Sequence, residues 1–282
     1  MSTRALLAGA AQRLADAGLP SPEPDAEWLL AHVLGRGRAG LAFAPVTEEQ
    51  RQSFEALLSR RAAGEPLQHI VGTAAFRHVE LAVGPGVFIP RPETELLAGW
   101  GIERLRALRA AGRPHPVVVD LCTGSGAIAK AVADEAPWAV VHAVELSEEA
   151  LAYAERNLES TGVDLRAGDA ADAFPDLDGG VDLVLANPPY IPVGEYESVA
   201  REVREHDPPI ALWSGEDGLD TVRVVERTAA RLLRAGGEVG CEHADSQGER
   251  VPAVFVRAGG WRDVRDHADL AGRPRFTTAR RA

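Results

Sequence analysis

The chain has 282 residues, of which 45% are hydrophobic, and a formal net charge of −12 at pH 7. This length can bury a large core shared between one large and one small domain, and no stretch of about 18 apolar residues is present that would predict a membrane span. The excess of 42 acidic over 30 basic residues argues against a protein that binds the phosphate backbone of DNA and is compatible with a basic protein partner.

The first predicted elements are helices. Apolar residues at helical spacing predict helices over residues 4–17 and 25–35. Thr47, followed by two glutamates, predicts the N-cap of a third helix that ends near residue 63. Alternating apolar residues then predict a short β-hairpin over residues 74–92, with a turn at 84–86 and a last strand at 87–89. A further helix is expected to begin at Pro92-Glu93-Thr94-Glu95.

Residues 117–129 predict the first β–loop–α unit of a nucleotide-binding α/β sheet. A β-branched run ending at Leu121 enters a turn with two glycines, and an alanine-rich helical pattern follows. Glycines allow unusual φ values and a close approach of the backbone to a ligand. The next strand, residues 139–144, leads into Glu145, where a carboxylate can accept both ribose hydroxyls of an adenosine group.

This region by itself fits two cofactors. Gly124, Gly126 and Ala129 also match the dinucleotide fingerprint, with Glu145 about 20 residues further on, so NAD is an alternative to S-adenosylmethionine. Asp120 favours S-adenosylmethionine, because a carboxylate at the end of the strand would repel a pyrophosphate but suits a ligand with an amino group and a sulfonium cation.

A second motif, Asn187-Pro188-Pro189-Tyr190, follows a buried strand predicted at residues 181–186. The Asn187 side-chain oxygen and the Pro188 carbonyl can hold both hydrogens of a planar –NH2 group, while Tyr190 lies against its flat face. The prolines fix φ and bring no competing N–H. A plain strand-to-loop turn is the alternative interpretation. We expect this strand to be the fourth of the same sheet, so that the motif opens on the edge that carries the glycine loop.

The C-terminal part is predicted to contain strands at 238–242, 261–265 and 275–279, which end in an antiparallel edge hairpin. Taken together, these segments resemble the release-factor glutamine N5-methyltransferases of the HemK/PrmC type. Further matching segments are residues 60–68, 86–95, 215–220, and Glu242 with Gln247-Gly248.

The resemblance implies an α/β fold: a Rossmann-like seven-stranded S-adenosylmethionine-dependent methyltransferase sheet with a small N-terminal helical domain joined by a β-hairpin. The expected parts are a substrate-docking domain over residues 1–73, the hairpin linker over 74–92 and the methyltransferase domain over 93–282. It also implies S-adenosyl-L-methionine as cofactor, and methylation of the glutamine side-chain nitrogen in the Gly-Gly-Gln motif of peptide chain release factors.

The same resemblance assigns roles to individual residues. The catalytic residues would be Asn187, Pro188, Pro189 and Tyr190, and these together with Phe88 would bind the substrate glutamine. The cofactor would be bound by Asp120, Cys122, Thr123, Gly124, Ser125, Gly126, Glu145, Asp169, Ala170 and Asn187. No metal is expected, since no Cys/His spacing suggests one.

The chain departs from the family pattern at several positions. Cys122 stands where glycine is more frequent, and Ala170 where an aromatic residue often covers the adenine. His206-Asp207-Pro208 replaces Tyr-Glu-Pro, and His243-Ala244 replaces a pair that ends in glycine. Two roles stay open: Phe88 contacts the substrate or fills the linker core, and Arg91 pairs with Glu93 or Glu95 or contacts the substrate.

Two alternatives from other classes are considered. An amino-group (adenine N6-type) nucleic-acid methyltransferase would need a basic target-recognition segment and aromatic residues for a flipped base, and neither is evident. A cofactor-binding adaptor without catalysis would not need the intact Asn-Pro-Pro-Tyr motif. We therefore expect a cytoplasmic monomer that acts on release factors, with no direct DNA binding and two free cysteines.

Overall fold

Residues 2–282 are described by the computed structural model, in which the chain divides into two units. Unit 1 contains the residues up to 73 together with the short segment 201–206, and unit 2 contains residues 74–200 and 207–282. No helix in residues 2–282 is long and apolar enough to cross a membrane.

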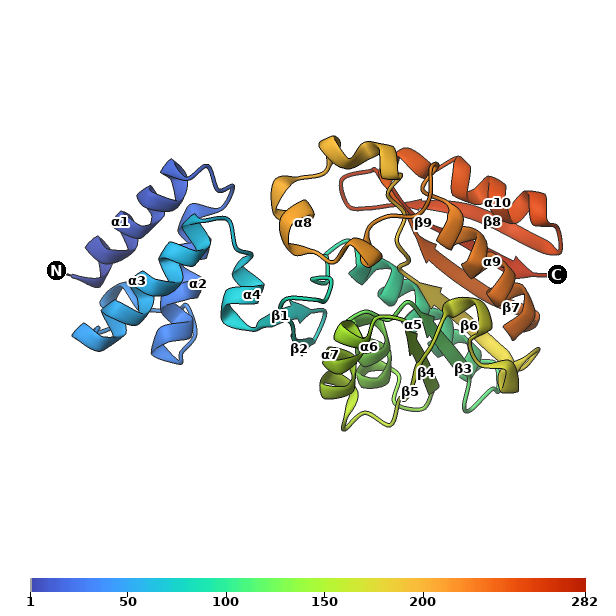
Figure 1. Ribbon diagram of the computed structural model, residues 1–282. Helices are drawn as coiled ribbons and strands as arrows, with labels where there is room; N and C mark the ends of the chain where they lie inside the picture. The colour runs from blue at the N-terminus through green and yellow to red at the C-terminus, as the bar shows by residue number, and fades with distance from the viewer. Residues whose placement is uncertain (1) are drawn as a thin grey trace. The chain divides into compact units, whose positions relative to one another are not determined.

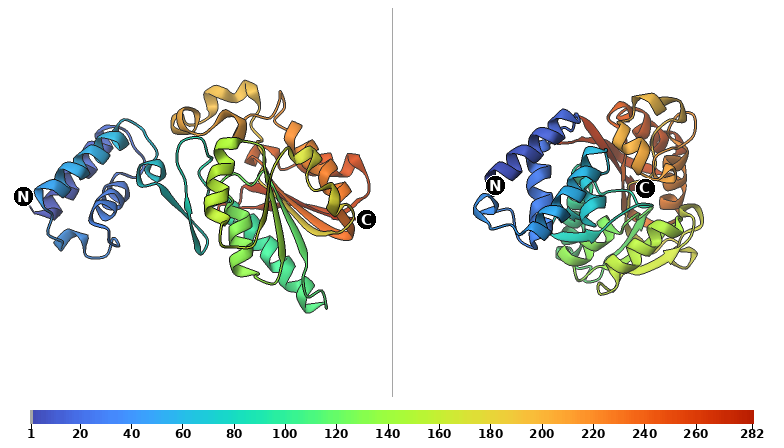
Figure 2. Two further views of the ribbon diagram at one scale, coloured as in Figure 1. Left: turned by 60° about the horizontal axis from the view of Figure 1, so that its bottom comes forward. Right: turned by 60° about the vertical axis from the view of Figure 1, so that its left-hand side comes forward.

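Unit 1 is helical (Figure 2). Its helices are α1 (Thr3–Asp16), α2 (Pro22–Leu34), the 3-10 turn η1 (Leu41–Phe43), α3 (Glu48–Ala62), α4 (Leu67–Val71) and α8 (Arg201–His206). The three predicted helices are confirmed. Thr47 caps α3 in a reciprocal pair with Gln50, as the sequence indicates. α2 begins three residues earlier than expected, because Pro22 is tolerated in a first turn, and α4 was not predicted.

An ion triad around the buried Arg61 ties α8 to the helices of unit 1. The guanidinium of Arg61 on α3 contacts Asp25 of α2 and Glu202 of α8, each at 2.7 Å. Both Arg61 and Asp25 are buried, so each charge is compensated by its partner rather than by water. A segment that follows the Asn-Pro-Pro-Tyr motif in the chain is therefore part of the N-terminal unit.

Unit 2 contains a seven-stranded sheet with the order β5-β4-β3-β6-β7-β9-β8. The strands are β3 (Val117–Leu121), β4 (Val140–Glu145), β5 (Asp164–Ala167), β6 (Val181–Ala186), β7 (Leu233–Glu242), β8 (Trp261–Ala268) and β9 (Pro274–Arg281). The first five are parallel, and β9 pairs antiparallel with both β7 and β8. The predicted edge hairpin and the position of the fourth strand are confirmed.

Helices cover both faces of this sheet (Figure 1). α5 (Thr94–Ala110), α6 (Ala127–Glu135) and α7 (Glu148–Leu158) pack on one face, and α9 (Asp220–Leu232) and α10 (Arg250–Ala258) on the other. Neighbouring strand residues belong to opposite cores: Val118 faces the first and Val119 the second. The loops contain the short 3-10 turns η2 (Ala170–Asp172), η3 (Pro175–Leu177), η4 (Val193–Ser198), η5 (Pro209–Ala211) and η6 (Asp245–Gln247).

The predicted hairpin needs a correction. Its strands are β1 (Thr73–Phe76) and β2 (Val79–Ala82), so the chain reverses at residues 77–78 rather than at 84–86. Residues 84–87 do form a turn, since the amide of Val87 donates to the carbonyl of Gly84, but no strand follows at 87–89. Val87 and Ile89 are instead buried in the core under α5. The apolar alternation there reflects packing, not strand pairing.

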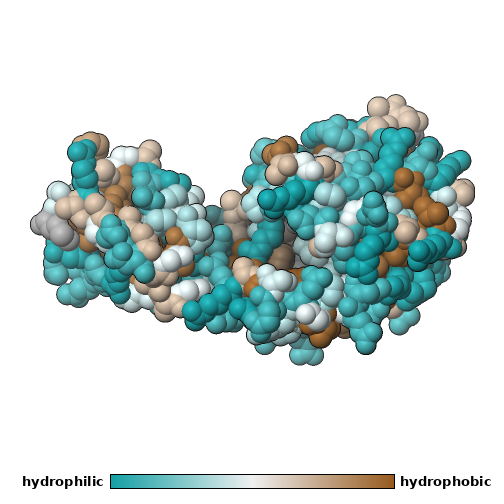
Figure 3. All heavy atoms as spheres, turned by 90° about the horizontal axis from the view of Figure 1, so that it is seen from above, coloured by the Kyte–Doolittle hydropathy of each residue, from teal (hydrophilic) through white to brown (hydrophobic). Residues whose placement is uncertain are grey.

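Hydrophilic residues dominate the face seen in Figure 3, where hydrophobic residues form scattered small groups. Large hydrophobic residues that stay exposed in unit 2 include Val193, Tyr196 and Ile210, in the loops that follow the Asn-Pro-Pro-Tyr motif.

Candidate active site

Four polar residues meet at one edge of the sheet. Asp120 is the last residue but one of β3. Glu145 and Glu242 end β4 and β7, and Asn187 directly follows β6. These strands are parallel neighbours, with Leu121 opposite Ala186 and Ala186 opposite Cys241, so their carboxyl ends are aligned. The chain order also reverses here, because β4 lies on one side of β3 and β6 on the other. Such a switch point is where open α/β sheets bind ligands.

The glycine loop connects β3 to α6 in a conformation that ordinary residues adopt with difficulty. Gly124 and Gly126 have φ values of +59° and +84°, and a Cβ on Gly126 would lie 3.1 Å from Leu158. Cys122 also has a positive φ, +60°, which explains why glycine suits this position better. Burial raises the pKa of the Cys122 thiol, and the side chain packs against the core on the α9 side.

Asp120 is fully buried and only half satisfied. One carboxylate oxygen, Oδ2, accepts hydrogen bonds from the Thr123 hydroxyl at 2.6 Å and the Ala129 amide at 3.1 Å. The other, Oδ1, has no hydrogen-bond partner among residues 2–282. Burial raises the pKa of Asp120 to about 7, against the opposing effect of those two bonds. A cation at this edge would supply the missing partner.

Glu145 joins the glycine loop to the next strand. Its Oε2 accepts from the Gly124 amide at 2.7 Å and its Oε1 from the Ser147 amide at 2.8 Å. Burial raises its pKa, while the backbone amides oppose that shift. A carboxylate has about four lone-pair sites, so Glu145 keeps acceptor capacity for hydroxyl groups. The side chain expected to bind ribose therefore also holds the loop in place.

Asn157 is a residue of the site that the sequence did not reveal. On α7, its Nδ2 donates to the carbonyls of Ser125 and Ala82, and its Oδ1 accepts from the Ala82 amide. It is buried, and it links the glycine loop to strand β2. A polar residue on the buried face of an amphipathic helix is the signal that could have identified it.

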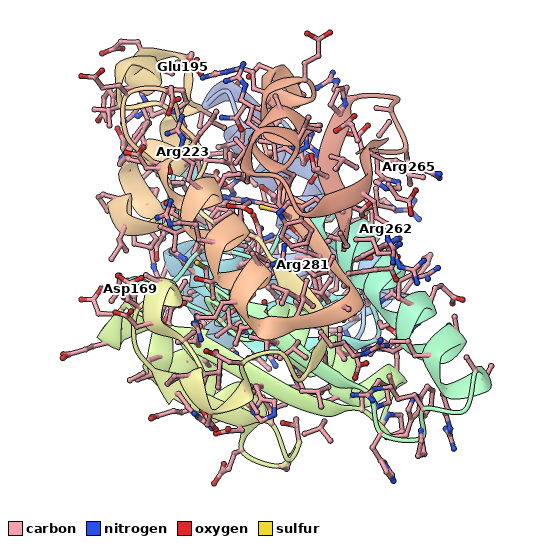
Figure 4. The ribbon with its side chains drawn as sticks, turned by 90° about the vertical axis from the view of Figure 1, so that its right-hand side faces the viewer. Asp169, Glu195, Arg223, Arg262, Arg265 and Arg281 are labelled. Carbon is pink, nitrogen blue, oxygen red and sulfur yellow. The ribbon has the colours of Figure 1, made fainter. Side chains whose placement is uncertain are left out.

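Asp169 and Ala170 follow β5. Asp169 is exposed on its loop (Figure 4), where its Oδ1 accepts from the Ala171 amide. Ala170 is buried in the core on the α9 side, and its carbonyl accepts from Thr228. Figure 4 also shows Arg262 and Arg265, on the edge strand β8, away from Asp169.

The Asn-Pro-Pro-Tyr segment is held from two sides. Nδ2 of Asn187 donates to the Thr94 hydroxyl at 3.2 Å, which leaves its Oδ1 without a hydrogen bond among residues 2–282. The side chain of Gln247 donates to the Tyr190 carbonyl at 2.9 Å. A Cβ on Gly218 would lie only 2.5 Å from that same carbonyl, so this close contact requires glycine. Thr94, Gly218 and Gln247 are thus supports that only the structure assigns to the motif.

Phe88 and Arg91 form a pair beside the motif. The guanidinium of Arg91 lies 4.8 Å from the centre of the Phe88 ring and forms an ion pair with the buried Asp207. Among residues 2–282, neither Glu93 nor Glu95 forms an ion pair with Arg91, and Glu95 accepts from the Arg77 amide. Phe88 is half-buried and lies outside the hydrophobic cores, unlike its neighbours Val87 and Ile89.

The residues present fit S-adenosylmethionine. The unpaired oxygen of Asp120 suits a cationic group, and Glu145 has capacity for ribose hydroxyls. The loop between them opens onto the N-terminus of α6, which begins at Ala127. Two carboxylates at this edge would repel the pyrophosphate of a dinucleotide.

Comparisons with known proteins agree with this geometry. Residues 5–72 match the family model of the PrmC N-terminal domain, and residues 118–207 match a methyltransferase domain. The catalytic domain of hMettl16 superposes with a TM-score of 0.51 at 16% identity, over 72% of this chain and 75% of that one, which shows a shared fold. That relation confirms the predicted α/β methyltransferase architecture.

Curated relatives extend over nearly the whole chain. The release factor glutamine methyltransferase of Streptomyces coelicolor is 58% identical over 98% of this chain and 97% of its own length. That of Mycolicibacterium smegmatis is 47% identical over 99% and 97%. A 4-amino-L-phenylalanine/4-methylamino-L-phenylalanine methyltransferase of Streptomyces pristinaespiralis is 50% identical over 72% of this chain and 69% of its own. With full-length relatives at this identity, the chain is an S-adenosylmethionine-dependent methyltransferase and belongs to the release factor glutamine methyltransferase family.

Proposed function

We propose that the chain transfers the methyl group of S-adenosyl-L-methionine to the side-chain nitrogen, N5, of the glutamine in the Gly-Gly-Gln motif of peptide chain release factors. The observation that carries this proposal is the orientation of Asn187. Its amide hydrogens point to Thr94, so its Oδ1 is an available acceptor at the same sheet edge as Asp120 and Glu145. The names of the full-length relatives support the choice of substrate.

The reaction sets clear demands on this acceptor. S-adenosylmethionine supplies an electrophilic methyl group on a sulfonium. The nitrogen of a glutamine amide is a weak nucleophile, because its lone pair is delocalised into the carbonyl. Asn187 Oδ1 and the Pro188 carbonyl would hold its two hydrogens, so that the nitrogen faces the methyl group and positive charge developing there is stabilised. The S–CH3 bond breaks as the N–CH3 bond forms, and the nitrogen then releases a proton to water.

The remaining assignments follow from this chemistry. Tyr190 and Phe88 would contact the glutamine, with Arg91 fixed by Asp207 behind the Phe88 ring. Asp120, Glu145 and the loop 122–126 would hold the cofactor, together with Asp169 and Ala170. Residues 1–73 would dock the release factor, and residues 74–92 would connect this domain to the methyltransferase domain. Residues 93–282 would bind the cofactor and catalyse methyl transfer. Release factors act in translation, which implies a cytoplasmic enzyme; we propose a monomer that does not bind DNA directly.

The test supplies the full-length enzyme with labelled S-adenosylmethionine and one of four acceptors: an intact release factor, a short Gly-Gly-Gln peptide, duplex DNA or 4-amino-L-phenylalanine. We expect efficient labelling of the release factor at a single glutamine and weak labelling of the peptide, because one side chain alone gives little binding energy. The free amino acid is included because of the half-identical relative that acts on it. Labelling of DNA or of the amino acid, without labelling of the release factor, would refute the proposal.

A further inference from the structure

Three polar side chains from distant parts of the chain lie in a row behind the Asn-Pro-Pro-Tyr motif. Nδ2 of Asn187 donates to Oγ1 of Thr94 at 3.2 Å, and the Thr94 hydroxyl lies close enough to the Glu242 carboxyl to lower its pKa. Oε2 of Glu242 has no hydrogen-bond partner among residues 2–282. Thr94 is the first residue of α5, and Glu242 is the last of β7, the strand next to β6. Thr94 is 3% and Glu242 1% exposed, so water does not compete for contacts between these side chains.

The chemistry of the three groups fixes the direction of the row. An ionised carboxylate only accepts hydrogen bonds, and a hydroxyl has a single hydrogen to donate. The Thr94 hydrogen therefore goes to Glu242, and the Thr94 oxygen accepts from Asn187. This leaves Oδ1 of Asn187 as the group that remains free. An Asn187 amide turned the other way would present hydrogens to the hydrogens of a substrate –NH2 group.

We propose that Thr94 and Glu242 are positioning residues for methyl transfer, which turn the Asn187 amide so that its oxygen receives the substrate nitrogen. The inference rests on the proposed function, because it gives a reason for the orientation of Asn187 in that reaction. Neither residue contacts the reacting atoms; each acts through Asn187. Burying an ionised carboxylate costs free energy unless the group has a partner. The positioning role gives a reason for keeping Glu242 at this buried place.

Protonation of Glu242 would reverse the row. The carboxyl hydrogen would then go to Thr94, and the Thr94 hydrogen would go to Oδ1 of Asn187. The charged groups that face Glu242 are Arg275 on β9, which favours its ionised form, and Glu93 before α5, which opposes it. Tyr190 of the motif is also close enough to be influenced by its charge. Turnover should therefore decline as Glu242 takes up a proton, at cofactor concentrations that keep the enzyme saturated.

The first test compares Thr94→Val with Thr94→Ser in the full-length enzyme acting on an intact release factor. Valine keeps the shape of threonine but removes the hydroxyl, so we expect kcat to fall by about tenfold to a hundredfold. Serine keeps the hydroxyl and should restore most of that loss. Calorimetry should show S-adenosylmethionine affinity within about twofold of wild type, because the row lies behind the motif. Thr161→Val removes another part-buried hydroxyl, which bonds only within the end of α7 and the following turn, and is the matched control.

The second test uses Glu242→Gln, which keeps the size of the side chain and removes its titration. For the wild type, kcat at saturating cofactor should fall below about pH 7, where burial has raised the pKa of Glu242. For Glu242→Gln that fall should be much smaller. If thermal melting shows that Thr94→Val does not fold, Glu242→Gln still tests the proposed positioning of Asn187.

The outcomes separate the two proposals. A wild-type enzyme that fails to methylate the release factor overturns the proposed function and this inference with it. A wild type that is active, with Thr94→Val equally active or with valine and serine equally impaired, overturns the inference alone. An unchanged pH dependence of kcat in Glu242→Gln overturns the role of Glu242.

Discussion

The two halves of the site are built in different ways. On the cofactor side, Asp120 bonds Thr123 and Ala129, and Glu145 bonds Gly124 and Ser147, all within one β–α–β stretch. On the substrate side, Asn187 depends on Thr94, 93 positions away in the chain. Gln247, 57 positions from Tyr190, holds the same segment. The carboxylates of the cofactor half are therefore held by neighbours in the chain, with Asn157 of α7 as a more distant support of the loop, whereas the substrate half exists only once distant elements have packed.

This difference predicts how each half fails. Substitutions in the cofactor half should change the affinity for S-adenosylmethionine, because the loop and its carboxylates are the groups that we propose bind the cofactor. Substitutions in the substrate half should change turnover and leave cofactor affinity nearly intact. Four experiments test that separation.

The largest expected effect is on turnover. Asn187→Ala removes one acceptor for the substrate amide, and kcat should fall by about two orders of magnitude or more, as for the loss of one oriented oxyanion-hole group. A radiolabel transfer assay measures kcat, and calorimetry measures cofactor affinity in parallel. Near-normal turnover would mean that the Asn-Pro-Pro-Tyr segment is a turn and not a binding site.

The second effect concerns pH and the cofactor. In the free enzyme, burial raises the pKa of Asp120 to about 7, so the group carries a proton below that pH. A cationic ligand favours the ionised form, and binding must therefore release this proton at lower pH. The Kd for S-adenosylmethionine should rise as pH falls below 7, approaching about tenfold per pH unit.

Asp120→Asn is the control for this pH dependence. The asparagine side chain cannot ionise. The Kd of this variant for S-adenosylmethionine should therefore be higher than that of the wild type, and it should vary less between about pH 5.5 and 7. A wild-type Kd that stays constant over this range would exclude Asp120 as the partner of the cationic group.

The third effect is on cofactor affinity at constant pH. Glu145→Ala removes an acceptor expected to bind ribose hydroxyls and also releases the Gly124 amide. The loss should be about 1.5–3 kcal/mol, or roughly tenfold or more in Kd, because the bonds involve a charged acceptor. Turnover with saturating cofactor should decrease much less. Equal losses in kcat and affinity would show that the two halves are not separate.

The smallest effect is on stability. Cys122 has a φ of +60°, which glycine adopts without strain. Cys122→Gly should relieve strain of about 1 kcal/mol, offset in part by the greater freedom of glycine in the unfolded chain. Chemical denaturation should show equal or slightly higher stability, with cofactor affinity retained. A large loss of stability would mean that the thiol itself packs against essential partners.

The same comparison explains which predictions from the sequence were right. Three predictions are confirmed: the strand before the glycine loop, the strand that leads into Glu145 and the capping of α3 by Thr47. Each could be predicted because it depends on neighbours in the chain. The hairpin turn was placed wrongly, at 84–86 instead of 77–78. Glycines and a proline marked the first position, whereas the real turn is closed by Arg77, whose φ is +51°. Its amide bonds Glu95 and its guanidinium pairs with Glu135, contacts that sequence patterns do not reveal.

The sequence by itself determined the fold class, the cofactor class and the residues that line the sheet edge, because β-branched runs, glycines and strand-ending polar residues act through local geometry. Tertiary structure decided how the substrate half is oriented. The partner of Arg91 is Asp207, 116 positions away, and the Asn187 amide donates to Thr94, 93 positions away at the start of α5. A hydrogen-bond direction depends on which donor and acceptor meet in space, and only the packing of α5, β6 and β7 brings Thr94, Asn187 and Glu242 together.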